Sequence, residues 1–320
     1  MSGGDGHAAR DLCGVLLNAR ASGVARDRAL LGAVRDLVGA DGRVEITDDL
    51  ALVPAAVERL AAGRPRVMAF CGGDGTLSCG LAALDRTVRA RGEALPPLLL
   101  LRAGTMTTIV RGLGERRPPL AALQATLRDL RDGAPPRTEP QPYVRCNDTP
   151  GFIIGAVIIA RLLERYYGAG GEGPQRAWRM VPRVVGPALL GRHDPETEAL
   201  FAPEPARLTV DGMALPLEQV RMLLAGTVAD VGIGMKFLYR ARERDGLFHV
   251  VALDAPAPLL ARRFPRAFLG QPWNVPDSFD GLASSLDVEF DRPQPYIHDG
   301  ELREAAALRV VHGGALDLVR

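Results

Sequence analysis

The segment Gly72-Gly73-Asp74-Gly75-Thr76 combines residue types that bind phosphate. An apolar run at 66–71 precedes it and apolar residues at helical spacing follow it, so we predict a turn between a buried strand and a helix. Glycines let a ligand approach the backbone N–H groups, and the N-terminus of a helix attracts an anion. We therefore interpret the segment as a site for a nucleotide phosphate, with a tight structural turn as the alternative.

The elements around this turn alternate between strands and helices. Apolar runs predict strands at 12–18, 66–71 and 98–101, and a short strand at 44–46. A loop is predicted at 19–26, after the first strand. Strands that alternate with helices form a parallel sheet with helices on both faces. Ligands bind such sheets at the carboxyl ends of the strands, where the Gly72 turn and a second turn at Gly104-Thr105 both fall.

The pattern changes in the proline-rich stretch 133–142, where we place a domain boundary. Beyond it, strand-like runs are separated by Asp-Gly turns typical of antiparallel sheets, and helical inserts are predicted at 175–190 and 258–268. We predict a parallel α/β domain at 1–137 and a mainly β domain at 138–312. The last residues of the chain are expected to pack back on the first domain.

Composition argues against several classes of function. The 39 basic and 38 acidic residues leave a net charge of +1, so nucleic-acid binding by bulk charge is not expected. The most apolar run, 152–163, is too short to cross a membrane, and no N-terminal signal segment is visible. Four cysteines without a CxxC spacing fit a reducing cytoplasm. They are Cys13, Cys71, Cys79 and Cys146.

Several motifs occur in an order that resembles the diacylglycerol kinase catalytic-domain family, which includes sphingosine and ceramide kinases and bacterial soluble lipid kinases. The family has an Asn-Pro-x-Ser-Gly loop, a GGDGT turn, a Pro-x-Gly-Thr-x-Asn-Asp loop, a glycine and Asp-Gly pattern in its second domain, and a late Asp-Gly-Glu. The similar segments here are, in turn, 17–23, 72–76, 102–108, 232–246 and 299–301. Because each motif is short, their shared order and spacing carry the resemblance.

The resemblance implies a doubly wound nucleotide-binding domain of the NAD kinase and diacylglycerol kinase type, a β-sandwich lipid-binding domain and a cleft between them. It also implies an ATP- and Mg²⁺-dependent lipid kinase. This enzyme would phosphorylate a hydroxyl of diacylglycerol or a related lipid such as a sphingoid base, within phospholipid biosynthesis. Peripheral membrane contact is expected, and a homodimer is left open.

In the nucleotide domain, two glycine turns and three polar residues are the expected phosphate and nucleotide contacts. These residues are Gly72, Gly73, Gly75, Thr76, Gly104, Thr105, Asn18, Ser22 and Thr47. Asp74 is the carboxylate that would bind or orient Mg²⁺, because this ion prefers oxygen ligands. Its alternative role is that of a helix N-cap.

In the second domain, the resemblance implies that Asp299 is the general base, a carboxylate that accepts the proton of a lipid hydroxyl. Glu301 would orient Asp299 or a metal. An ordinary hairpin turn is the alternative, since Asp-Gly is typical of such turns. At Asp245 the resemblance implies a structural metal site, with a plain turn again as the alternative. His298 is interpreted as a surface neighbour of the motif without a catalytic role.

Two features keep other functions open. Thr107-Thr108 replaces the Asn-Asp of the family, which removes a carboxylate and allows a catalytically inactive nucleotide- or lipid-binding homologue. The GGDGT turn is shared with NAD kinases, so a kinase for a soluble acceptor such as NAD is the second alternative. The Asp299-Gly300-Glu301 element favours the lipid branch.

Overall fold

The computed structural model describes residues 11–27, 29–103, 108–114, 116–168, 174–190 and 194–320. The chain divides into two compact units. The first comprises 1–110, 114–141 and 316–320, and the second comprises 111–113 and 142–315. Among the described residues, no helix has the length and apolar character needed to span a bilayer.

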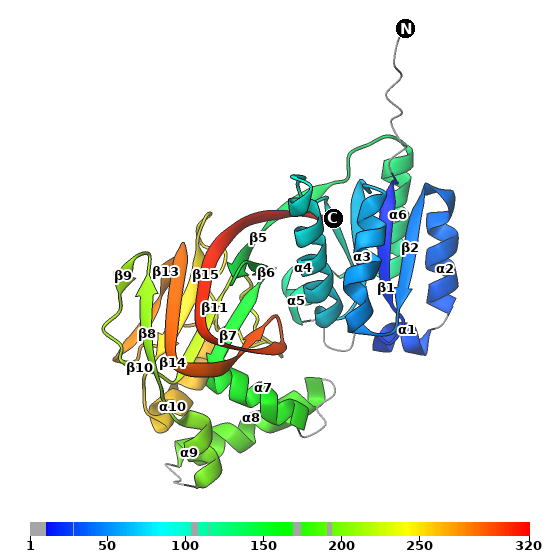
Figure 1. Ribbon diagram of the computed structural model, residues 1–320. Coiled ribbons are helices and arrows are strands. Elements are labelled where there is room, and N and C mark those ends of the chain that lie inside the picture. The colour runs from blue at the N-terminus through cyan, green and yellow to red at the C-terminus, as the bar shows by residue number, and fades with distance from the viewer. Residues whose placement is uncertain (1–10, 28, 104–107, 115, 169–173, 191–193) are drawn as a thin grey trace. The chain divides into compact units, whose positions relative to one another are not determined.

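The first unit is built on a parallel sheet (Figure 1). Its strands lie in the order β2-β1-β3-β4, and the end of β15 pairs in parallel with β4. The strands are β1 (Cys13–Asn18), β2 (Gly42–Thr47), β3 (Val67–Gly72), β4 (Leu98–Arg102) and β15 (Glu301–Val319). The helices are α1 (Ser22–Arg26), α2 (Ala29–Val38), α3 (Val53–Ala62), α4 (Asp74–Ala90), α5 (Thr108–Gly112) and α6 (Pro119–Arg131), with short 3-10 turns at Gly39–Asp41 and Leu50–Leu52.

Helices cover both faces of this sheet. Successive strand residues point to opposite faces, and all six residues of β3 are buried, as expected for a central parallel strand. On one face, Val15, Ala69 and Leu101 belong to a core shared with α2 and α6. On the other face, a Cβ added to Gly80 of α4 would lie 2.5 Å from the ring of Phe70. The alternation that the sequence shows therefore places the turn after β3 at the carboxyl edge of the sheet.

The second unit is mainly antiparallel. Besides β15, its described part contains β5 (Thr138–Cys146), of which residues 138–141 belong to the first unit, and nine further strands. These are β6 (Thr149–Gly151), β7 (Ile153–Val157), β8 (Glu204–Val210), β9 (Met213–Ala214), β10 (Gln219–Val220), β11 (Met222–Gly226), β12 (Phe248–Leu253), β13 (Ser278–Ala283) and β14 (Ser285–His298). Strands β13, β12, β11, β7 and β14 pair in that order, and β14 also pairs with β8 and β15. The helices are α7 (Ile158–Gly168), α8 (Pro174–Leu189), α9 (Pro195–Phe201) and α10 (Ala257–Phe268).

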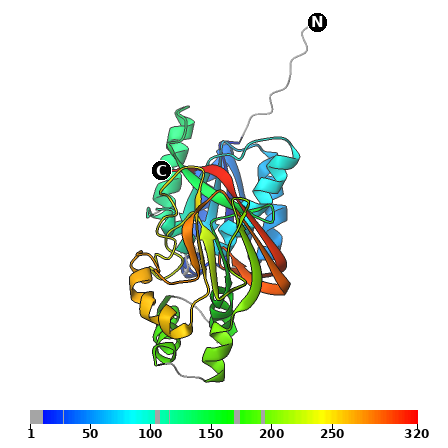
Figure 2. The ribbon, with the colours of Figure 1, turned by 90° about the vertical axis from the view of Figure 1, so that its left-hand side faces the viewer.

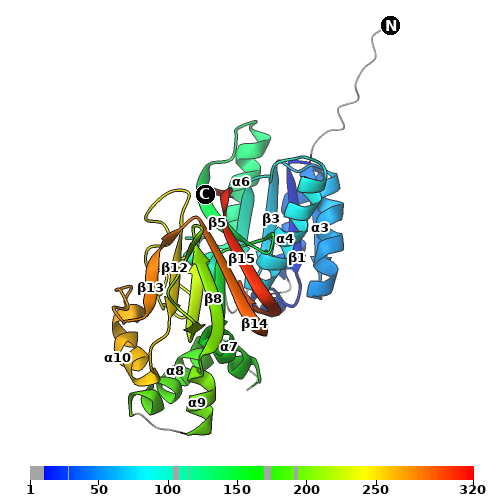
Figure 3. The ribbon, with the colours of Figure 1, turned by 60° about the vertical axis from the view of Figure 1, so that its left-hand side comes forward.

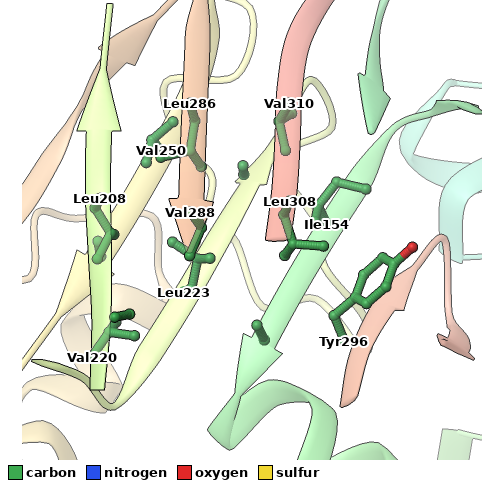
Figure 4. Close-up of a cluster of buried hydrophobic side chains, with 14 of the residues drawn as sticks. Ile154, Leu208, Val220, Leu223, Val250, Leu286, Val288, Tyr296, Leu308 and Val310 are labelled. Carbon is green, nitrogen blue, oxygen red and sulfur yellow. The ribbon is translucent and has the colours of Figure 1, made fainter. Parts of the chain in front are cut away.

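Strand β14 connects the two sides of this unit's core. Its register with β15 shifts between Glu289 and Gln294; residues before the shift pair with β8, and residues after it pair with β7. Such an irregularity bends a strand, which allows it to leave one layer and enter another. Figure 4 shows the apolar side chains of β8, β14 and β15 gathered with those of β7, β11 and β12 in one cluster.

The predicted fold class, a parallel α/β unit followed by a mainly antiparallel β unit, is confirmed. One local prediction is wrong. Residues 19–26 contain the short helix α1 where a loop was expected, although no side chain caps its N-terminus. A long-range hydrogen bond holds this segment, in which Gly23 N–H donates to the Ala103 carbonyl over 2.7 Å.

Candidate functional site

The Gly72 turn lies between β3 and α4, as its sequence predicts. Gly72 is the last residue of β3, Gly73 is the N-cap of α4, and Asp74 is the first residue of the helix. A Cβ on Gly72 would lie 2.5 Å from Thr76 Oγ1, so only glycine leaves room for that side chain beneath the turn. The amides of Gly73 and Gly75 belong to the N-terminal turn of a 17-residue helix, where an anion is favoured.

Asp74 does not cap its own helix. Its Oδ1 accepts hydrogen bonds from the backbone N–H groups of Ile109 and Val110, at 3.2 and 3.4 Å. Both amides lie in α5, the helix that follows β4. The N-cap interpretation of Asp74 is therefore wrong for α4, and the carboxylate instead ties the Gly72 turn to the segment after β4.

Asn18 joins the same turn to β1. Its Nδ2 donates to Thr76 Oγ1 over 3.0 Å, and its Oδ1 accepts from the Arg20 backbone N–H over 2.9 Å. Thr76 is buried beneath the turn. The structure thus brings Asn18, Asp74 and Thr76 together, and it gives the Thr76 side chain a role in shaping the turn in addition to the predicted phosphate contact.

Four residues end adjacent strands in one row along the carboxyl edge: Thr47, Asn18, Gly72 and Arg102. Asn18 is the register partner of Thr47, and Gly72 is the partner of Arg102. Thr47 is buried, and among the described residues its hydroxyl has no hydrogen-bond partner, so it is available to a bound group. Because β1 separates β2 from β3, Thr47 lies beyond Asn18 from the glycine turn.

Two arginines at this edge were not singled out from the sequence. Arg102 ends β4 beside Gly72, and Arg20 follows β1; both are exposed. A guanidinium beside a glycine turn favours phosphate because it supplies charge and several N–H donors. Their positions directly after predicted strands were the available signal.

Some predicted contacts cannot be placed. Gly104, Thr105 and Thr107 lie outside the described residues, and only the backbone is described for Ser22 and Thr108. Ser22 begins α1, and Thr108 begins α5.

The residues at the turn suit a Mg²⁺ ion that arrives with a nucleotide. Within the described part of the chain, no group of three His, Cys, Asp or Glu side chains could hold a metal alone. Mg²⁺ in nucleotide sites is commonly bound by one or two carboxylates together with the phosphates. Asp74 supplies one carboxylate, so the donor set fits the ion as part of a nucleotide complex.

The second candidate region is the hairpin between β14 and β15. Asp299 and Gly300 form its two-residue turn, with positive φ values of 54° and 87°, as in a type I′ turn. Asp299 is only 2 % exposed, and its Oδ1 accepts from the N–H groups of Phe152 and Ile153 at 2.8 and 2.9 Å. The hairpin interpretation is thus correct for the backbone, while the carboxylate also anchors the start of β7.

The surroundings of this turn contradict one prediction. His298 is fully buried, not a surface neighbour, because β14 pairs with both β7 and β15 at this position. Burial, with a contribution from the nearby Arg303, lowers the pKa of His298 to about 3, so the ring is neutral at pH 7. A Cβ on Gly151 would lie 2.0 Å from His298 Nε2 and 2.9 Å from Asp299 Oδ2, so a glycine is required there.

Glu301 and Asp245 differ in their surroundings. Glu301 is partly buried, which raises its pKa, although Arg303 at 3.8 Å opposes the shift. Asp245 is exposed in the turn before β12, with Gly246 at φ 77°. No cluster of metal-binding side chains includes Asp245 within the described ranges. Its exposure and turn geometry agree with a plain turn, and a metal site formed partly by backbone carbonyls stays a prediction.

Comparison with known proteins supports the fold. No protein-family model and no curated protein matches the sequence. A diacylglycerol kinase from Bacillus anthracis str. Sterne shares the fold with a TM-score of 0.65 and 15 % identity, covering 97 % of this chain and 96 % of that one. Two further structures from the same organism, assigned to the diacylglycerol kinases, have TM-scores of 0.71 and 0.68 at 15 and 16 % identity. These two alignments each cover 97 % of this chain, and 96 and 97 % of the others.

The chain therefore has the two-unit fold of these bacterial diacylglycerol kinase structures over nearly its whole length. This confirms at the level of the fold the resemblance seen in the ordered motifs. At such identities the likeness defines architecture, and the activity must be argued from the site.

Proposed function

We propose that the protein is an ATP- and Mg²⁺-dependent lipid kinase that phosphorylates a hydroxyl of diacylglycerol or a related lipid such as a sphingoid base. The observation that carries the proposal is the Gly72 turn. It lies at the carboxyl edge of a parallel sheet and is tied to both neighbouring segments through Asn18 and Asp74. A turn held on both sides is preorganised for phosphate, and the similar folds support a lipid kinase over other phosphate-binding proteins.

On the nucleotide side, the amides of the α4 N-terminus would bind phosphate oxygens, and Arg102 would supply positive charge beside them. Bound Mg²⁺ would neutralise charge on the β- and γ-phosphates, and Asp74 is the residue that would hold it. Thr47 would contact the nucleotide through its hydroxyl.

On the acceptor side, Asp299 is the proposed general base. The lipid hydroxyl oxygen would form a bond to the γ-phosphorus while the bond to the ADP oxygen breaks, and the hydroxyl proton would pass to the Asp299 carboxylate. The amides of Phe152 and Ile153 fix Oδ1 and thereby orient the group. Glu301, two residues later, would orient Asp299 or a metal.

A transfer assay tests the proposal. Labelled γ-phosphate from ATP and Mg²⁺ would be followed into diacylglycerol, sphingosine, ceramide, phosphatidylglycerol and NAD in mixed micelles. A labelled lipid supports the kinase and names its acceptor. Labelled NAD would show that the protein is a kinase for a soluble acceptor. ATP binding without any labelled product would show that it is a catalytically inactive homologue, the alternative that Thr107-Thr108 keeps open.

The assay includes a matched pair of variants. Asp299→Asn changes the Asp-Gly turn of the β14–β15 hairpin, and Asp245→Asn changes an exposed Asp-Gly turn of the same unit. Loss of transfer in Asp299→Asn alone supports its role as the base. Equal transfer activity in both variants would show that Asp299 is not the general base.

A further inference from the structure

Helices α8 and α10 of the second unit carry positive charge without any negative charge. Together they contain six arginines, and neither contains an aspartate or glutamate. The two helices pack against each other and lie at one end of the second unit, as Figure 2 and Figure 3 show. This concentration contrasts with the net charge of +1 for the whole chain. The arginines of these two helices therefore form a local basic region on an almost neutral protein.

The outward faces of the two helices share a sequence pattern. Both contain Arg-x-x-Pro-Arg, in which the first arginine, the proline and the second arginine follow helical spacing and share one face. The positions are Arg179, Pro182 and Arg183 in α8, and Arg262, Pro265 and Arg266 in α10. All six are exposed. Among the described residues none of these four arginines has an acidic partner, and the Arg266 guanidinium donates one hydrogen bond, to the side chain of Gln271.

The opposite face of α10 is fixed in the protein. Leu260, Ala261 and Ala267 are buried, and the Phe264 ring lies 5.7 Å from the Phe237 ring in an edge contact. Rotating the helix to hide its arginines would expose these apolar groups to water. The basic face is therefore held outward.

A large apolar side chain is exposed at the end of each basic face. Leu269 follows α10 and is 68 % exposed, and Leu190 follows α8 and is 72 % exposed. Leu269 lies three residues after Arg266, and Leu190 lies seven residues after Arg183, so each continues the exposed face of its helix. A bilayer surface offers both kinds of contact, because its anionic headgroups attract arginines and its acyl boundary accepts leucine side chains.

We propose that the surface formed by Arg179, Arg183, Leu190, Arg262, Arg266 and Leu269, the twin-helix surface, binds the surface of an anionic lipid bilayer. The arginines would contact lipid phosphates and the leucines would enter the acyl boundary. Glu196 and Glu198 on the neighbouring α9 limit the basic region to α8 and α10. This inference deepens the membrane contact expected of a lipid kinase by assigning it to one surface, and it can fail while the proposed function holds, because membrane binding is measured without turnover.

Other partners fit these residues less well. A nucleic-acid backbone would pair with the arginines but leave both leucines in water. A second copy of the chain would bring identical basic faces together across a two-fold axis, and like charges would repel. A lipid surface satisfies the charged and the apolar groups at once.

Vesicle sedimentation with the full chain tests the proposal. The vesicles contain phosphatidylcholine with phosphatidylglycerol, and vesicles of phosphatidylcholine alone are compared. The double variant Arg262→Gln/Arg266→Gln should bind the anionic vesicles about 25-fold more weakly, from about fivefold per arginine. The matched control, Arg207→Gln/Arg309→Gln, removes two exposed charges from strands β8 and β15 and should change binding less than about twofold.

The leucines provide a second measurement. Leu190→Ser/Leu269→Ser should weaken vesicle binding at least about tenfold while its salt dependence remains, because the arginines are retained. Equal loss in the matched control, or equal binding to vesicles without phosphatidylglycerol, would overturn the proposal. A dimer that the leucine variant dissociates, with vesicle binding unchanged, would also overturn it and assign the surface to self-association.

Discussion

The side-chain amide of Asn18 donates a hydrogen bond to the Thr76 hydroxyl over 3.0 Å and so joins the end of β1 to the turn after β3. Because Thr76 lies beneath the glycine turn, this bond fixes the shape of the proposed phosphate site from a strand 58 residues away in sequence. The hydrogen bond therefore offers a means of perturbing the phosphate site without altering the glycines.

Replacing Asn18 with aspartate should weaken ATP binding. The aspartate would accept the Thr76 proton in place of donating to its oxygen, and it would add negative charge next to bound phosphate. We expect about a tenfold loss of affinity, or about 1.4 kcal/mol, in a calorimetric titration. If the variant keeps its melting temperature and its ATP affinity is unchanged, the Asn18–Thr76 hydrogen bond does not contribute to ATP binding.

Gly72→Ala should destabilise the first unit. The new Cβ would lie 2.5 Å from Thr76 Oγ1, and such overpacking costs about 1–3 kcal/mol. Gly32→Ala is the control, since Gly32 lies in α2, where an added Cβ would meet no atom within 4 Å, and alanine is about 1 kcal/mol better than glycine inside a helix. Denaturant unfolding should therefore show changes of opposite sign for the two variants.

Asp299→Asn should reduce lipid phosphorylation by at least about 100-fold and leave ATP affinity nearly unchanged, because a general base acts only on the acceptor. The asparagine can still accept the two amide hydrogen bonds through its carbonyl oxygen, so the hairpin should persist. Steady-state transfer and ATP titration on the same preparation give both quantities. A variant that turns over normally would contradict the assignment.

His298 should make stability fall in acid. Its pKa is about 3 in the folded chain, against 6.5 when exposed, so the unfolded state binds the proton first as the pH drops. The contribution is constant above pH 6.5 and is lost between about pH 6.5 and 3, by up to about 1.4 kcal/mol per pH unit. Between pH 6.5 and 4.5, the free energy of unfolding of the wild type should therefore fall relative to that of His298→Gln, by up to this slope. Glu301 and His312 titrate in both proteins, so their effects cancel in this comparison. If the two free energies of unfolding change with pH in parallel, the prediction is wrong.

The order of elements could be predicted because it depends on local patterns. Residues 67–71 are apolar and precede glycines, and that pattern alone predicts β3 and the start of α4. The antiparallel unit was equally visible in its alternating runs and Asp-Gly turns. Helix α1 was not predicted, because the contact that holds it joins Gly23 to Ala103, far along the chain.

The arrangement of the candidate site depends on such distant contacts. For Asp74 the sequence left a helix cap as the alternative to a Mg²⁺ ligand, and its actual hydrogen-bond donors, the amides of Ile109 and Val110, come from another helix. His298 lies beside a turn, where exposure is the reasonable expectation, and only its pairing with β7 and the absence of a side chain at Gly151 explain its burial. Local sequence patterns indicate which residues form turns. The hydrogen-bond partners of their side chains are distant in the sequence and become known only from the fold.

Strand β15 has a consequence for how the protein is made. The strand begins in the second unit, and its last residues, 316–319, belong to the first together with Arg320. Leu318 pairs with Leu98 of β4, and the Arg320 side chain donates a hydrogen bond to Glu139 over 2.8 Å. During synthesis the residues of the first unit up to position 141 leave the ribosome before the second unit, yet their sheet stays without the strand beside β4 until residues 316–319 have been translated. The two units are therefore expected to reach their native states together, however early the first begins to fold.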